Sequence, residues 1–112
     1  LCTLGICSAP GACTNDADAS VLGSFDIAGE VESCAGGCVF ASDKTACGKD
    51  CMVDATGISV DCAECFGETI DCAFSQCTFE CGFGSAEECL ACQESKGCFQ
   101  TFEECAGIPP VN

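Results

Sequence analysis

From Asp26 onward, apolar and polar positions alternate with the period of a helix. Ile27, Val31 and Cys34 fall on one face, while Glu30 falls on the side that faces water. The pattern predicts a helix that begins near Asp26 and breaks at the next pair of glycines.

The next two stretches show the same period and are bounded by capping residues. Ser42 or Asp43 can cap a helix that ends near Gly57, because their side-chain oxygens accept backbone N–H groups of a first turn. Ser59 can cap a longer helix that ends near Gly82. The pattern thus predicts two more helices in succession.

The clearest helix start is the capping box Ser85-Ala-Glu-Glu88, in which hydroxyl and carboxylate satisfy each other's free backbone donors. The helix that it opens is predicted to stop at Gly97. A last short helix is predicted over Cys98–Cys105, with its end at Gly107.

The two ends of the chain lack a helical period. The N-terminal stretch carries Leu1, Leu4 and Ile6 without a local core for them to enter, so we expect it to dock on its own domain or on a neighbouring copy. The sequence therefore predicts three parts: an extended N-terminal arm at 1–14, a helical domain at 15–107 and an extended C-terminal tail at 108–112.

Four cysteines at regular spacing predict a stapled helical hairpin. Cys34 and Cys38 share one helix face, as do Cys47 and Cys51, because residues four apart lie one turn above each other. In two antiparallel helices the residue numbers of each bonded pair add up to nearly the same total. That total is 85 for Cys34 with Cys51 and for Cys38 with Cys47, so these pairs are the predicted bonds.

The other cysteines leave alternatives open, because connectivity does not follow from sequence alone. Two further hairpins would contain the bonds Cys62–Cys81 and Cys65–Cys77, and Cys89–Cys105 and Cys92–Cys98. The cysteines then left over are Cys2, Cys7, Cys13 and Cys72. In the competing interpretation, residues 59–77 form one helix, with Cys62, Cys65 and Cys72 on one face and bonded to other segments.

Composition places the chain among disulfide scaffolds. Sixteen cysteines in 112 residues are typical of small proteins from an oxidising compartment, so we expect an extracellular, secreted or cell-surface protein. A metallothionein-like thiolate cluster would not need the eight phenylalanines. The expected fold is all-α: small helical hairpins held by about eight disulfides, with extended N- and C-terminal arms.

The charge balance argues against several functions. Eighteen acidic residues and three lysines give a net charge of −15, which opposes nucleic-acid binding. The sequence contains no histidine and no arginine, so the usual base near neutral pH is missing and we do not expect an enzyme. The pairs Glu87–Glu88 and Glu103–Glu104 are adjacent residues on helices and do not converge on a common point.

Two kinds of motif have spacings that suit redox or metal chemistry. Cys62-Ala-Glu-Cys65 and Cys89-Leu-Ala-Cys92 have redox spacing but lack a preceding strand. The acidic stretch after residue 15 partly matches a calcium loop, although the sixth and twelfth positions are not glycine and glutamate. Its candidate ligands are Asp16, Asp18, Ser20 and Asp26. We expect no cofactor.

Two resemblances follow from the cysteine spacing. The run from about Cys34 to Pro109, especially ECLACQESKGCFQTFEECAGIPP, resembles cysteine-rich segments in secreted and lipid-anchored proteins of myxobacteria, which implies no particular activity. The first cysteine set looks like an α-hairpinin, a class that includes plant defence peptides and protease inhibitors. This chain is longer and acidic.

These features favour an extracellular structural protein that assembles into a filament or surface layer. We expect a homo-oligomer or polymer with no membrane span, in which residues 1–13 lie on an adjacent copy through Leu1, Leu4 and Ile6. A bond from Cys2, Cys7 or Cys13 could cross that contact. The alternative is a monomeric binding module, such as an inhibitor or effector.

Overall fold

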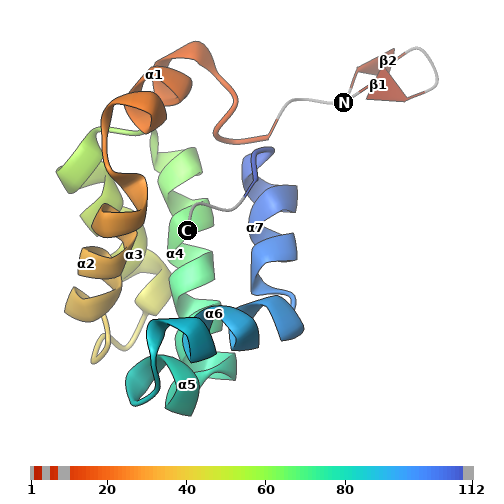
Figure 1. The fold of residues 1–112 in the computed structure, drawn as a ribbon. Coiled ribbons are helices and arrows are strands. Elements are labelled where there is room, and N and C mark those ends of the chain that lie inside the picture. Colours follow the sequence, from red (N-terminus) through yellow and green to blue (C-terminus); the bar gives the residue numbers. More distant parts are fainter. Residues whose placement is uncertain (1, 4–5, 8–10, 110–112) are drawn as a thin grey trace.

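The computed structural model describes residues 2–3, 6–7 and 11–109, and this part of the chain is all-α apart from two short strands (Figure 1). The strands pair antiparallel, with Cys2 opposite Cys7. The elements in chain order are β1 (Cys2–Thr3), β2 (Ile6–Cys7), α1 (Asp16–Ser24), α2 (Ile27–Gly37), α3 (Lys44–Thr56), α4 (Val60–Gln76), α5 (Thr78–Gly82), α6 (Ala86–Ser95) and α7 (Cys98–Ala106).

Predicted capping residues begin the main helices. The side chains of Asp26, Asp43, Ser59 and Ser85 each accept the backbone N–H of the residue three positions later. In the predicted capping box, the carboxylate of Glu88 accepts from the hydroxyl of Ser85 at 3.3 Å. The predicted helix starts are therefore confirmed. The carboxylate of Glu88 contributes through the hydroxyl of Ser85, where a capping box would use the backbone N–H of Ser85.

Helix α1 is not among the helices predicted from the sequence, where its acidic stretch was compared with a calcium loop. Asn15 caps it: its side-chain oxygen accepts the N–H of Asp18 at 2.8 Å. Asp16 and Asp18 lie in the first turn, where negative charge stabilises the positive end of the helix dipole. The same residue types serve a calcium loop and a helix start, and here they start a helix.

The long helix α4 ends at Gln76 rather than at Gly82. The backbone of Cys77 leaves helical geometry, with φ −128° and ψ 39°, and the short helix α5 follows as a separate element. The chain therefore changes direction at a cysteine that carries no turn signal, which explains why the sequence pattern placed the helix end too late.

Helices α3 and α4 approach each other closely enough to need glycine at their crossing. A Cβ atom on Gly67 would collide with the carbonyl oxygen of Thr45, and one on Gly48 would lie 3.0 Å from the Cα of Gly67. The contact between these two helices is the most extensive in the fold. Beside it, the rings of Phe66 and Phe102 join α4 to α7, with centroids 4.9 Å apart.

The α2–α3 hairpin is stapled as predicted. Cys34 bonds Cys51 and Cys38 bonds Cys47, with Cα–Cα distances of 5.7 and 5.8 Å. Both pairs of residue numbers add up to 85, so this equality correctly predicted two antiparallel helices.

The other predicted pairs are wrong, and the competing interpretation of one long helix is confirmed. Cys65 and Cys77 lie near opposite ends of α4, about 18 Å apart at 1.5 Å per residue, so this segment cannot fold back on itself. The bonds Cys62–Cys81, Cys65–Cys77, Cys89–Cys105 and Cys92–Cys98 do not form. The observed bonds are Cys13–Cys62, Cys65–Cys105, Cys72–Cys98, Cys77–Cys92 and Cys81–Cys89.

Four of these bonds are nested around a single point of the chain. In each of the four bonds that lie within residues 65–105, the two residue numbers add up to 169 or 170. The chain therefore runs out along α4 and α5, turns at Ser85, and returns along α6 and α7. Bonded pairs have nearly equal totals in this region too. The region turns once, at Ser85, whereas the predicted pairs assumed two separate hairpins.

The last residues of the predicted arm dock on their own domain. The N–H groups of Ala12 and Cys13 donate to the carbonyl oxygens of Cys105 and Ala106, each at 3.0 Å, and Cys13 is bonded to Cys62. The expectation that the arm up to residue 13 lies on a neighbour is thus wrong for residues 11–13. Cys13 is likewise unavailable for a bond between chains.

Candidate association surface

A partly open groove of about 380 Å³ lies between α2, α4 and α6 and is lined mainly by apolar side chains. Val31 contributes from α2, Phe74 from α4 and Leu90 from α6. We call this feature the α2–α4–α6 groove. Its volume falls within the range of about 300–1,000 Å³ that is typical of ligand-binding pockets.

The groove exists because short side chains face it and because α2 is held on α3. Ala28 and Ala35 line it from α2, and Ala73 lines it from α4. Two disulfides tie α2 to α3, whereas α2 makes few contacts with α4. The space that larger side chains would fill therefore stays open.

The polar side chains that line the groove are those of Glu32, Thr69, Ser85 and Gln93, and only Glu32 carries a charge. Glu32 is exposed at its edge, while Gln93 is buried and its side-chain N–H group points at the sulfur of Cys89, 3.3 Å away. The three lysines of the chain, Lys44, Lys49 and Lys96, do not belong to the described lining. The groove is thus an apolar surface with a negative edge.

Exposed phenylalanines form a second apolar feature. Phe79 and Phe83 lie four residues apart on and just after α5, with ring centroids 6.4 Å apart, and are 75% and 84% exposed. Phe40, in the link between α2 and α3, is 97% exposed. Leu90 of the groove is also partly exposed, at 38%. Exposed apolar side chains that lie side by side, as Phe79 and Phe83 do, can mark interaction surfaces in soluble proteins.

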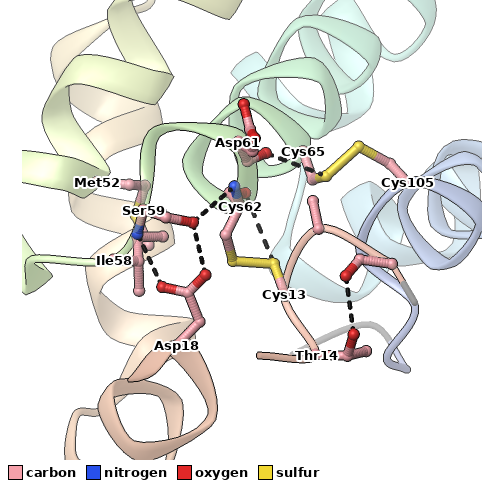
Figure 2. Close-up of a disulfide and its surroundings, with 12 residues drawn as sticks. Cys13, Thr14, Asp18, Met52, Ile58, Ser59, Asp61, Cys62, Cys65 and Cys105 are labelled. Carbon is pink, nitrogen blue, oxygen red and sulfur yellow. Dashed lines mark hydrogen bonds between the residues drawn. A yellow bond between two sulfur atoms is a disulfide. The ribbon is translucent and has the colours of Figure 1, made fainter. Parts of the chain in front are cut away.

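Asp18, a candidate calcium ligand, instead joins α1 to the start of α4. Figure 2 shows its carboxylate turned toward Ser59, whose N–H and hydroxyl donate to it at 2.8 and 2.6 Å; Asn15 donates at 2.7 Å. Burial by itself would raise the pKa of Asp18, but these hydrogen bonds outweigh it and hold the pKa below its ordinary value. Asp18 is therefore a structural carboxylate at the N-terminus of α4.

The other candidate calcium ligands serve separate local roles. Asp26 caps α2, Asp16 lies exposed in the first turn of α1, and the carbonyl oxygen of Ser20 accepts from the hydroxyl of Ser24. Within the described part of the chain, no three His, Cys, Asp or Glu residues are grouped so as to hold a metal ion.

The CxxC pairs and paired glutamates are likewise accounted for by structure. Each cysteine of the two CxxC motifs is bonded to a partner outside its motif. Glu87 and Glu88 lie in the first turn of α6, and Glu103 and Glu104 are exposed on α7.

Part of the predicted self-assembly segment falls outside the described residues. Leu1 and Leu4 are not described, and Ile6 is described only as a backbone position of β2. The side chains of Cys2 and Cys7 are not described either. The fourteen cysteines whose side chains are described are all paired, in seven disulfides.

Sequence reasoning missed both the groove and the exposed phenylalanines. The groove depends on three helices whose arrangement was not known. The spacing of Phe79 and Phe83, four residues apart, was an available signal that one helix face is aromatic. The prediction made no use of this signal, because it treated the region as the end of the helix that begins at Ser59.

Comparison of the chain with protein-family models, with curated proteins and with solved structures finds no match. No helix in the described ranges is both long and apolar enough to cross a membrane.

Proposed function

We propose that this protein is an extracellular structural protein whose copies associate into a filament or surface layer. The observation that carries the proposal is an apolar surface that the described residues leave exposed: the α2–α4–α6 groove together with Phe79 and Phe83. Such a surface is stabilised when a second molecule covers it.

An extracellular location is supported by the disulfides. Seven of them staple the described chain, and such bonds persist in oxidising compartments. Each typically contributes about 2 to 4 kcal/mol, so the fold is expected to be durable. Durability suits a material outside the cell.

Apolar contact must overcome electrostatic repulsion between copies. Each chain carries a net charge of −15, but at physiological salt this repulsion is screened beyond about 8 Å. Burial of a large apolar side chain contributes roughly 1.5 to 3 kcal/mol. Several such side chains are exposed, so association is feasible without a bond between chains.

A contact between unlike surfaces leaves each copy with a free site for the next copy. If the rotation between copies does not close a ring, this geometry gives an open filament. The expected product is therefore a polymer rather than a closed dimer.

The acidic charge also supports a second candidate, a monomeric module that binds a basic, partly apolar partner in the same groove. Salt separates the two functions. Screening strengthens association between like-charged copies and weakens binding between opposite charges.

Electron microscopy of the native material tests the proposal. We expect filaments or layers, and we expect their loss when Phe79 and Phe83 are both changed to serine. The matched control is Phe25→Ser, because Phe25 is partly exposed but lies in the link between α1 and α2. Dispersed single particles in native material would contradict the structural function and favour the binding module.

A further inference from the structure

We infer that the α2–α4–α6 groove receives the uncharged N-terminal segment, residues 1–10, of a second copy of this chain. This inference rests on the proposed self-association and names the two surfaces that meet. It is carried by the distribution of charge along the chain, by the lining of the groove and by the point where the segment leaves the domain.

The N-terminal segment is the part of the chain best suited to approach an acidic neighbour. All eighteen acidic residues and all three lysines lie between Asp16 and Glu104. Residues 1–15 are the longest stretch without a charged side chain. A neutral segment avoids the charge repulsion that any other long part of this chain would meet at the negative edge of the groove.

The segment and the groove also match in polarity. Leu1, Leu4 and Ile6 supply apolar side chains in the segment. The groove presents Val31, Phe74 and Leu90 between its alanines. Apolar side chains from the segment would therefore replace water in the groove, and Glu32 at the edge would stay solvated.

The point of departure of the segment favours contact with another copy. Residues 11–13 are fixed on α7 and on Cys62, near the start of α4, whereas the groove is lined by residues 69–74 in the second half of that helix. Cys62 and Ala73 are about 16 Å apart along the axis at 1.5 Å per residue. Figure 1 shows β1 and β2 apart from the helices, at the opposite end of the fold from α5 and α6.

Because the segment and the groove are different surfaces of the chain, a contact between them in two copies is head to tail. One copy contributes its segment, the next contributes its groove, and both copies keep one unused surface. The two surfaces can therefore be inactivated in separate chains and then combined.

The experiment uses two full-length variants and a control in sedimentation velocity. Leu90→Glu places a charge in the groove at a partly exposed position, and Ile6→Glu places one in the segment. Val60→Glu is the matched control, because Val60 is 56% exposed on α4 but is not a groove residue. Far-UV circular dichroism checks that all three variants are folded.

We expect the control to polymerise like the natural protein, and each groove or segment variant to need at least about a tenfold higher concentration to associate. A one-to-one mixture of the two variants should form dimers and stop there, because only one intact segment and one intact groove remain per pair.

Three outcomes would overturn the inference. Normal polymerisation of Leu90→Glu would exclude the groove while leaving the proposed structural function in place. Variants that stay monomeric when mixed would show that groove and segment do not meet. A natural protein that remains monomeric at every concentration would remove the proposed function and, with it, this inference.

Discussion

The α2–α3 hairpin and the α4–α7 region are built on the same principle but at different scales. In the first, two disulfides are nested across one short link between adjacent helices. In the second, four disulfides are nested around Ser85 and join helices up to 40 residues apart. Cysteine spacing thus identifies nested bonds between two adjacent helices, but not those of a region in which two helices lie on each side of the turn.

The two regions should differ in how much a single disulfide stabilises them. Changing Cys65 and Cys105 to serine, with Cys72–Cys98 still bonded, opens a loop of about 15 residues and should lower the free energy of unfolding by about 3 kcal/mol. Changing Cys38 and Cys47 to serine opens a loop of 9 residues and should cost about 2.6 kcal/mol. Guanidinium unfolding of both double variants measures the difference. A larger loss from the smaller loop would contradict a chain-entropy origin.

The junction between the two regions depends on the close approach of α3 and α4. Gly67→Ala should lower the free energy of unfolding by about 2 to 3 kcal/mol, because the added methyl group meets backbone atoms of Thr45 that cannot move aside easily. Gly23→Ala on α1 is the control, since no heavy atom outside its own helix turn lies within 4 Å. Urea unfolding should show little change or a small gain for that variant.

A second junction joins α1 to α4 through Asp18. Asp18→Asn should cost about 2 kcal/mol at pH 7, because the amide cannot accept all the hydrogen bonds that the carboxylate accepts. Since folding lowers the pKa of Asp18, its contribution is present above the unfolded-state pKa of about 3.9 and is lost as the pH falls through the lower folded value. Unfolding free energies at pH 7 and pH 2 should therefore differ less in the variant than in the natural protein. An equal difference would exclude this role.

The turning point of the α4–α7 region is capped by Ser85. Ser85→Ala removes the acceptor for the N–H of Glu88 and should cost about 1 kcal/mol, the smallest effect of this series. Thermal unfolding followed by circular dichroism measures it. Ser95→Ala, at the last residue of α6, is the control and should leave the melting temperature nearly unchanged.

Helix starts were the most predictable part of this fold, because capping is a local interaction. Asp43, Ser59 and Ser85 all act within three residues of their own position. The bond from Cys65 to Cys105 depends on how four helices return on one another, and no local signal gives that path. Asp18 was noticed for its charge but not for its partner Ser59, which lies 41 residues away.

The candidate surface was predictable only in part. The apolar N-terminal segment is visible as Leu1, Leu4 and Ile6, and its self-assembly role stays a prediction. Its proposed binding groove is formed by alanines from helices that are distant in the sequence. Such a groove follows from packing, so a helical period alone does not reveal it.

Sedimentation velocity of the natural protein at increasing salt tests the claim of self-association most directly. At pH 7 the average mass should rise with concentration, and rise further between low and physiological ionic strength, because salt screens the net charge of −15 on each copy. A single monomeric species at every concentration and salt level would contradict the account.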